Sequence, residues 1–363
     1  MKSAVITLHA VRNYGSALQA YATQEIFNSL GFDVEIIDYR RKAVLYVPIW
    51  KMLLSKISLG EKLKALIIRP SLNKANKVFE PFLEQYLSLS SARYTENIDF
   101  VRFPINADIF CTGSDQVWNT DWHIEIPEPF FLSFVPDEKK KISFSASFGK
   151  EKLAEWEVNK ERELLMRYDA ISVRESSGVD ILRKLGLQGV QVLDPTQLLT
   201  ESQWNVIAEK ERICKEKYIL VYQLSNNKEF EKYTSKLKKK KGLKLIRLCT
   251  RYDQIRKPGK GIVLPTIEQF LALIRDAEYV LTDSFHATSF CLLFHKQFLS
   301  SAPDRFVTRL ESILELFGLE NRMINDYSDY YAIDKKIDYC HVDKVLNIKR
   351  REAMEFLITA IHS

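Results

Sequence analysis

The chain has 363 residues, more than one hydrophobic core usually supports, so two domains are expected. Hydrophobic residues make up 46% of the sequence and charged residues 28%, which excludes a largely disordered chain. The net charge of +6 suits an anionic substrate or an anionic membrane surface, and it does not indicate a nucleic-acid partner.

The cysteines and the first residues of the chain indicate the cellular compartment of the protein. Five cysteines are scattered without a C-x-x-C pair, and the histidines show no metal-ligand spacing, so we expect reduced thiols and no metal site. The initial MKSAVITL is too short for a signal peptide, and no run of 18 apolar residues predicts a spanning helix. These features predict a cytoplasmic protein in which any membrane contact is peripheral.

The first 40 residues predict a β-α-β unit. Residues 4–8 form an apolar run typical of a buried strand, residues 16–30 have helical periodicity, and residues 34–38 predict the next strand. Gly31 is the expected end of the helix. A doubly wound parallel sheet begins in this way, so the expected fold class is α/β.

Residues 43–95 interrupt this pattern with an amphipathic insertion. Ser58 and Glu61 have the spacing of a capping box, and Pro70 is expected to end the helix that follows. Residues 50–69 carry five basic residues and one acidic residue, a net charge of +4. A basic amphipathic helix suits a membrane surface, whereas a domain-packing or dimerisation helix is the alternative.

The rest of the chain predicts two successive α/β sets. We place the domain boundary near residue 215, giving domains of residues 1–214 and 215–363, with the last helix (349–361) crossing back. Further strands are predicted at 107–111, 142–145, 170–173, 191–193, 218–223, 244–249 and 279–282, and helices at 201–210, 228–240, 267–276 and 287–293.

Residues that directly follow predicted strands are the candidates for chemistry, because ligands of open parallel sheets bind beyond the carboxyl ends of the strands. Neither a G-x-G-x-x-G motif nor a Walker motif is present, so no dinucleotide or nucleoside triphosphate site is indicated. Four segments qualify: HAVRNYGSALQA (9–20), TGSDQVWN (112–119), SVRES (172–176) and TDSFHATS (282–289).

The first two of these segments suit a sugar or an anion. Gly15 and Ser16 would offer backbone N–H groups and a hydroxyl to a cleft, although residues 13–15 also fit a tight turn. Residues 113–116 place short polar groups beside Trp118, whose aromatic face suits a sugar ring. The alternative is a helix cap with a tryptophan in the core.

The other two segments supply a titratable group and a cation. His286 would project from a loop or first helical turn, where a neutral imidazole takes a proton from a hydroxyl; a helix cap by Asp283 or Ser284 is the alternative. Arg174 could present its planar guanidinium to a carboxylate or phosphate, or form a salt bridge with Glu175.

Six strings occur in order along residues 10–320: NYGSALQAYATQ, GSDQVWN, SFSASFG, ISVRES, VLDPTQLL and TDSFHATSF. Together they resemble the polysaccharide pyruvyl transferase family. The resemblance implies two Rossmann-like domains facing a cleft, in the glycosyltransferase-B-like arrangement, with residues 1–214 on the acceptor side and residues 215–363 on the donor side. It also implies phosphoenolpyruvate as donor, a hexose of a bacterial surface glycan as acceptor, and a pyruvate ketal as product.

The resemblance assigns roles to individual residues. Arg174 matches the family arginine that grips phosphoenolpyruvate, and His286 matches the histidine of a D-R-L-H-G motif. Ser284 stands where that motif has arginine, so Arg305 or Arg309 is expected to make the second anion contact. The expected catalytic residues are His286, Arg174 and Asp115; the donor-binding residues are Arg174, Ser284, Phe285, His286, Arg305 and Arg309; the acceptor-binding residues are Asn13, Tyr14, Gly15, Ser16, Ser114, Asp115, Gln116 and Trp118.

The implied chemistry needs an acid, a base and cationic groups but no metal or cofactor, since phosphoenolpyruvate is a co-substrate. The implied acceptor is an oligosaccharide on undecaprenyl diphosphate, with the basic stretch at 50–69 as a contact to the cytoplasmic face of the inner membrane. Two alternatives stay open: a nucleotide-sugar-dependent glycosyltransferase of the same fold, and a non-catalytic glycan-binding protein, which the serine at position 284 favours.

Overall fold

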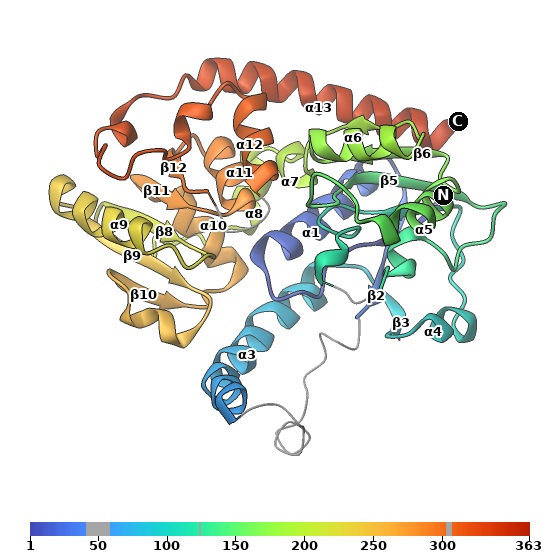
Figure 1. Cartoon of the computed structure of the whole chain (residues 1–363), viewed down its shortest axis with the longest axis horizontal. Helices are drawn as coiled ribbons and strands as arrows, with labels where there is room; N and C mark the ends of the chain where they lie inside the picture. The colour runs from blue at the N-terminus through green and yellow to red at the C-terminus, as the bar shows by residue number, and fades with distance from the viewer. Residues whose placement is uncertain (41–58, 123–124, 303–306) are drawn as a thin grey trace.

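The structure, a computed structural model, describes residues 1–40, 59–122, 125–302 and 307–363. Within them the strands form two separate parallel sheets, one in each half of the chain (Figure 1). The seven-stranded sheet has the order β3-β2-β1-β4-β5-β6-β7 and the five-stranded sheet the order β10-β9-β8-β11-β12. In both, the order reverses beside the first strand, as in doubly wound folds.

The first sheet contains every strand predicted in the first 214 residues, and one more. Its members are β1 (Lys2–Ile6), β2 (Asp33–Tyr39), β3 (Leu89–Tyr94), β4 (Ile109–Thr112), β5 (Lys140–Ala146), β6 (Ala170–Val173) and β7 (Val190–Gln191). The helices of this half are α1 (Tyr14–Ser29), α3 (Leu59–Tyr86), α4 (Asn97–Arg102), α5 (Glu155–Leu165), α6 (Ser176–Lys184), α7 (Pro195–Leu198) and α8 (Glu201–Ile207).

The second half repeats the alternation of strands and helices. Its strands are β8 (Tyr218–Tyr222), β9 (Lys244–Cys249), β10 (Lys260–Val263), β11 (Tyr279–Thr282) and β12 (Gln297–Ser300). Its helices are α9 (Lys228–Lys241), α10 (Ile267–Arg275), α11 (Phe285–Leu293), α12 (Val307–Leu316) and α13 (Tyr339–His362). Strands β3, β10 and β12 have no counterpart among the sequence predictions, nor do helices α4, α5, α6, α7 and α12.

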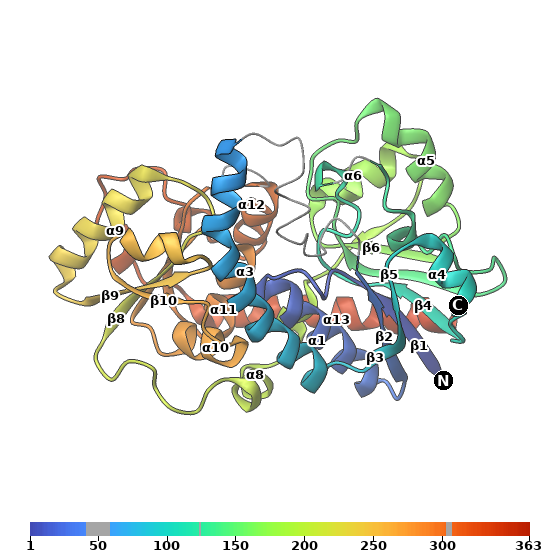
Figure 2. The ribbon, with the colours of Figure 1, turned by 90° about the horizontal axis from the view of Figure 1, so that it is seen from below.

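Helix α3 corrects the prediction that a helix ends at Pro70. The helix continues to Tyr86 with Pro70 and Pro81 inside it. Tertiary packing outweighs the lost backbone bonds, because Phe79 and Phe82 are buried against the core. Figure 2 shows α3 running between the two halves. The predicted start of this helix at Ser58 and most of the basic stretch at 50–69 lie outside the described side chains.

Helix α13 begins ten residues before its predicted start and lies along both halves (Figure 1). Near its end, Lys140 of β5 donates to the carbonyl of Ile361 at 3.1 Å. In its middle, Arg350 donates to the carbonyls of Gln197 and Leu199, both at 2.7 Å. The last helix of the chain therefore fastens the second half to the first.

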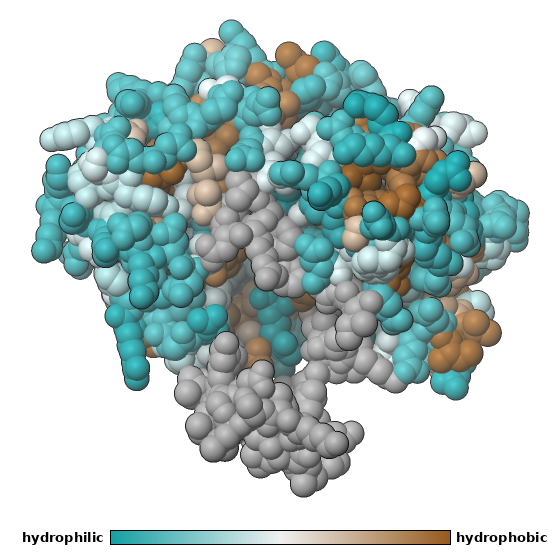
Figure 3. Space-filling model, viewed as in Figure 1, coloured by the Kyte–Doolittle hydropathy of each residue, from teal (hydrophilic) through white to brown (hydrophobic). Residues whose placement is uncertain are grey.

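The two halves also share one hydrophobic core. Tyr14 of α1 stacks on Phe270 of α10 with ring centroids 4.5 Å apart, and its hydroxyl donates to the carbonyl of Pro265 at 2.7 Å. Trp204 of α8 packs between Tyr21 and Phe290. On the face drawn in Figure 3 the described surface is mainly hydrophilic, with separate hydrophobic patches. The continuous core between the sheets holds their carboxyl edges in a fixed relation.

Candidate active site

Asp194 accepts hydrogen bonds from residues that follow different strands of the first sheet. Its Oδ1 accepts from the backbone N–H of Thr196 at 2.9 Å and so caps α7, directly after β7. Its Oδ2 accepts from Arg174 Nη1 at 2.6 Å and from the Ser114 hydroxyl at 3.1 Å. The carboxylate is buried, so these contacts replace water as its partners.

Arg174 follows β6 and carries a buried guanidinium, 1% exposed. Besides Asp194, it lies 3.5 Å from Asp115 Oδ1, and its Nε lies 4.0 Å from Glu175 Oε2. The guanidinium carbon, Cζ, lies 4.6 Å from the ring centroid of Phe285. Arg174 Nε and Glu175 Oε2 are buried and have no hydrogen-bond partner among the described residues. Such unsatisfied buried groups make this place a candidate site for a polar ligand.

His286 lies in the first turn of α11, after β11. Ser284 caps this helix, accepting from the N–H of Ala287 at 3.3 Å. The imidazole is buried, and its Nε2 lies 3.6 Å from Asp194 Oδ2, beyond hydrogen-bond distance. Gly15 makes this position possible, because a Cβ on Gly15 would lie 2.0 Å from His286 Nδ1. The turn after β1 is therefore shaped to admit the histidine of the other half.

Asp115 adds a second carboxylate, from the loop after β4. It accepts a hydrogen bond from the hydroxyl of Ser16, in the first turn of α1. Its backbone adopts φ 73°, a left-handed conformation that an aspartate tolerates better than most residues. The side chain is therefore fixed toward Ser16 and Arg174, between the ends of β1, β4 and β6.

The buried carboxyl groups and Arg174 influence one another's protonation states. Burial alone would raise the pKa of Asp194 and of Asp115. For Asp194 the nearby His286, followed by Arg174 and Thr196, outweighs burial and lowers the pKa. For Asp115 the charges of Arg174 and His286 and the hydrogen bond from Ser16 do the same. Burial alone would lower the pKa of Arg174, but Asp194 and Asp115 raise it. Both carboxyl groups are therefore ionised and the guanidinium is charged at neutral pH.

Arg309 of α12 brings a second guanidinium to the same aromatic ring, 5.9 Å from the centroid of Phe285. Burial and the charge of Arg174 lower the pKa of Arg309 to about 10, so it stays cationic at neutral pH. With its amide oxygen turned toward α12, Gln116 accepts from Arg309 Nη2 at 2.9 Å. Arg305, the other predicted substitute, lies outside the described residues.

The structure thus brings most of the predicted site residues together, but it corrects two. Tyr14 lies in the core between the halves with its hydroxyl on Pro265, so it is not available to an acceptor. Trp118 is fully buried, stacked on Phe131, with its indole N–H donating to the carbonyl of Phe130 at 3.1 Å. The alternative interpretation of that segment, a core tryptophan, is the correct one. Asn13 caps α1 by accepting from the N–H of Gly15 at 2.9 Å.

Two residues of this constellation were missed as site residues. Asp194 stands in VLDPTQLL, directly after a predicted strand. An Asp-Pro pair at that place is typical of a helix N-cap, and this role alone explains the aspartate without a contact to Arg174. Glu175 was weighed only as a salt-bridge partner of Arg174. Its Oε1 accepts from Ser147 and from the N–H of Phe148, so it joins the loop after β5 to the site.

The described residues contain no group of three or more His, Cys, Asp or Glu side chains that could hold a metal ion. None of the helices in the described part of the chain is long and apolar enough to span a membrane.

The family model of polysaccharide pyruvyl transferase matches residues 13–305, most of the chain and every described group of the site except Arg309. The chain belongs to this family. It is therefore a polysaccharide pyruvyltransferase, and the resemblance inferred from the six sequence strings is confirmed. No curated protein matches the chain in a sequence search.

Solved structures with the same fold confirm the expected glycosyltransferase-B-like arrangement of the pyruvyltransferase. The UDP-N-acetylglucosamine 2-epimerase from Rickettsia bellii superposes with a TM-score of 0.58 at 9% identity, covering 99% of this chain and 96% of that one. The UDP-GlcNAc 2-epimerase from Methanocaldococcus jannaschii gives a TM-score of 0.51 at 14% identity, with 96% and 93% covered. At these identities the similarity is one of fold.

Proposed function

We propose that this pyruvyltransferase takes its pyruvyl group from phosphoenolpyruvate and attaches it as a ketal to a hexose of a lipid-linked bacterial surface-glycan precursor. The observation that carries the proposal is the position of two arginines, Arg174 and Arg309, at one phenylalanine ring beside a buried histidine. A donor with a carboxylate and a phosphate on one small enol ester requires such a paired cationic site.

The donor is held by the arginines and Phe285. Arg174 is fixed by Asp194 through Nη1. This leaves Nε, a buried donor with no hydrogen-bond partner among the described residues and 4.0 Å from Glu175 Oε2, for a carboxylate or phosphate oxygen. Arg309 supplies the second positive charge in place of the arginine that the family motif has at position 284. The apolar methylene of the enol suits the ring of Phe285.

His286 is proposed to handle the protons of the reaction. It protonates C3 of the enol ester, which makes C2 electrophilic; one sugar hydroxyl then attacks C2 and the bond from C2 to the phosphate oxygen breaks. A second hydroxyl of the same hexose closes the ketal on C2. One hydroxyl proton replaces that given to C3, and the other leaves with inorganic phosphate, so the reaction balances without a redox step, a metal or a cofactor.

The acceptor is proposed to bind on the side formed by the loops after β1 and β4. The ionised Asp115 and the hydroxyls of Ser16 and Ser114 lie next to Arg174, where they can accept from and orient two sugar hydroxyls. Asn13 and Gln116, both partly exposed, stand at the outer side of this group. Gly15 contributes space and backbone rather than a side chain.

We further propose that the acceptor is carried on undecaprenyl diphosphate and that the enzyme works at the cytoplasmic face of the inner membrane. The net charge of +4 over residues 50–69 supports this, since each basic residue near an anionic surface contributes about 1 kcal/mol of attraction. Co-sedimentation with anionic liposomes should fall when Lys51, Lys56, Lys62 and Lys64 are all replaced by Glu. Unchanged co-sedimentation would contradict the proposed contact of this stretch with the membrane.

The transfer itself is tested by phosphate release from phosphoenolpyruvate, with lipid-linked and free galactose- or mannose-containing acceptors and with EDTA present. Release that needs an acceptor and disappears in His286→Ala is expected. Stabilisation of the protein against heat by UDP or GDP, without stabilisation by phosphoenolpyruvate, would instead favour a nucleotide-sugar glycosyltransferase. Failure of both ligands to stabilise the protein would favour a glycan-binding protein.

A further inference from the structure

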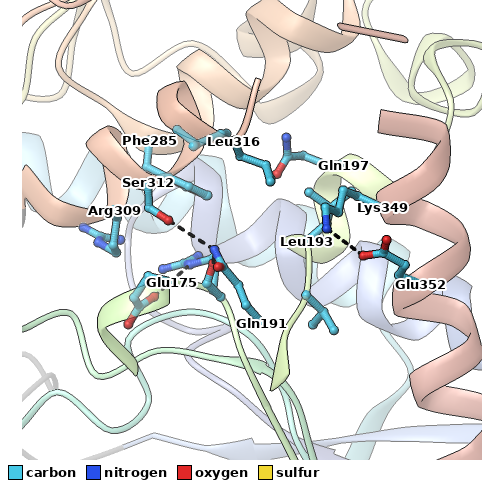
Figure 4. A pocket seen from close by; sticks show the side chains of 13 residues that line it. Glu175, Gln191, Leu193, Gln197, Phe285, Arg309, Ser312, Leu316, Lys349 and Glu352 are labelled. Carbon is cyan, nitrogen blue, oxygen red and sulfur yellow. Dashed lines mark hydrogen bonds and ion pairs between the residues drawn. The ribbon is translucent and has the colours of Figure 1, made fainter. Parts of the chain in front are cut away.

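A pocket lies between β7, α12 and α13, and it ends at the donor residues of the proposed site (Figure 4). The buried Arg174 and Phe285 line its inner end. Its other lining residues include Arg309, Ser312 and Lys349, which are partly exposed, and Gln191, which is exposed. The pocket is formed by both halves of the chain, because β7 belongs to the first sheet and α12 packs against α11 of the second half.

Burial changes along this pocket from one end to the other. The side chain of Arg174 is 1% exposed and Phe285 is 8% exposed, so the inner end is closed off from solvent. At the outer end the Lys349 and Glu352 side chains are 36% and 48% exposed, and Gln191 is an exposed residue. The pocket is therefore a passage from the surface to the guanidinium of Arg174.

The groups assigned to the acceptor do not line this passage. Its lining residues include Arg174, Phe285 and Arg309 but not the acceptor groups Ser16, Ser114 and Asp115, which lie around Arg174 and Asp194 in the segments after β1 and β4. His286, assigned to the protons, lies after β11 and does not line the passage either. The two substrates can therefore reach the same arginine from different sides. A large acceptor on its own side would leave this passage open.

The charges of the passage suit a small anion. Three of its lining residues are cationic, namely Arg174, Arg309 and Lys349, and two are carboxylates, Glu175 and Glu352. Lys349 stands at the outer end in a contact of 2.7 Å with Glu352, a partly exposed pair that binds weakly. Cations placed successively along a narrow passage raise the local concentration of an anion and its rate of association.

We propose that this passage is the port by which the small anionic donor reaches Arg174 and by which inorganic phosphate leaves, separate from the side on which the glycan binds. The inference rests on the proposed function, since it assigns the route of its donor. The hydrogen bond of 3.1 Å from Gln191 to Ser312 crosses the port between the two halves, so a large side chain at position 312 would obstruct it (Figure 4).

The port is tested by Ser312→Trp, with Glu311→Trp as the matched control, because Glu311 is exposed on the same helix and does not line the pocket. We expect the tryptophan at 312 to lower kcat/KM for phosphoenolpyruvate at least tenfold and to leave KM for the acceptor within twofold. The control should match the wild type. Ser312→Ala, which loses the same hydrogen bond without filling the pocket, should lose much less than the tryptophan variant.

A second variant keeps the test valid where Ser312→Trp fails to fold. Lys349→Glu should lower kcat/KM for the donor about tenfold at low salt and weaken its dependence on ionic strength, whereas Lys344→Glu, exposed on the same helix and outside the pocket, should do neither. Wild-type donor kinetics in both Ser312→Trp and Lys349→Glu would overturn the port while leaving the pyruvyl transfer intact. Absence of any pyruvyl transfer by the wild type would instead overturn the proposed function.

Discussion

The imidazole of His286 occupies the space that a side chain on Gly15 would need, since a Cβ there would lie 2.0 Å from its Nδ1. Gly15 belongs to the first helix of the chain, and His286 lies 271 positions later, in the second half. The site is thus assembled by a close approach of the backbone of one half to a side chain of the other.

Gly15→Ala is expected to displace His286 and to abolish acceptor-dependent phosphate release, while destabilising the fold by about 1–3 kcal/mol through overpacking. The decisive measurement is a double-mutant cycle with His286→Ala, followed by thermal unfolding. Because the histidine ring is the obstacle, Gly15→Ala should cost little stability when the ring is absent. Equal costs in both backgrounds would show that the imidazole does not lie against Gly15.

Arg174→Lys keeps the charge but loses the planar guanidinium that binds Asp194 and faces Phe285. We expect kcat/KM for phosphoenolpyruvate to fall by about 10²-fold, equivalent to roughly 3 kcal/mol, and donor-induced thermal stabilisation to be lost. Arg183→Lys, an exposed arginine of α6, is the control. A lysine variant with unchanged donor kinetics would remove Arg174 from the donor site.

Arg309→Gln should raise KM for the donor about tenfold, the effect of losing roughly 1.4 kcal/mol of charge-assisted binding. Arg305→Gln is the appropriate comparison, because the sequence predicted either arginine as the second anion contact. In the described part of the chain Arg309 lies at the ring of Phe285, beside Arg174, so its variant should show the larger effect. Loss of donor binding in Arg305→Gln alone would transfer the role to Arg305.

Tyr14→Phe separates the predicted and observed roles of this tyrosine. The variant removes the buried hydrogen bond to the Pro265 carbonyl, so it should lower the free energy of unfolding by about 1–2 kcal/mol. Since the hydroxyl does not face the acceptor groups, KM for the acceptor should stay within twofold of the wild type. An acceptor KM raised tenfold with unchanged stability would restore the original prediction.

The sequence predicted the parts of this protein whose signals are local. Apolar runs located the strands of both sheets except β3, β10 and β12, and the strand-to-loop junctions located Ser16, Asp115, Arg174 and His286. Pro70 shows where such local signals fail. Proline favours the end of a helix, but α3 continues past Pro70 because its later residues pack against the core, and a local pattern does not reveal that packing.

Contacts between residues that are far apart in the sequence could not be predicted either. Nothing in the segment around Gly15 indicates that the histidine of another domain packs on it, and the same holds for Asp194, whose partners Ser114 and Arg174 lie 80 and 20 positions away. Trp118 illustrates a further difficulty: an aromatic residue beside polar groups suits a sugar site and a core equally well, and only the packing on Phe131 decides.

Glu161, outside the site, should make the stability of the protein fall as the pH rises. Its carboxyl group is fully buried in α5, and neither oxygen has a hydrogen-bond partner among the described residues. Burial, helped by the nearby Glu157 and opposed by Lys150, raises the pKa of Glu161 to about 9, from an ordinary value of 4.5. Between these two values the unfolded chain releases the proton and the folded protein keeps it, so rising pH favours unfolding.

Glu161→Gln removes this effect and should therefore stabilise the protein increasingly between pH 5 and pH 8, by a difference on the order of 3 kcal/mol at the upper end. The measurement is Tm of wild type and variant across this range, with Glu163→Gln, exposed on the same helix, as the control. Because Glu163 is solvated, its variant should follow the wild type at every pH. Parallel curves for Glu161→Gln and wild type would mean that Glu161 is ionised in the folded protein, with Lys150 as its compensating charge.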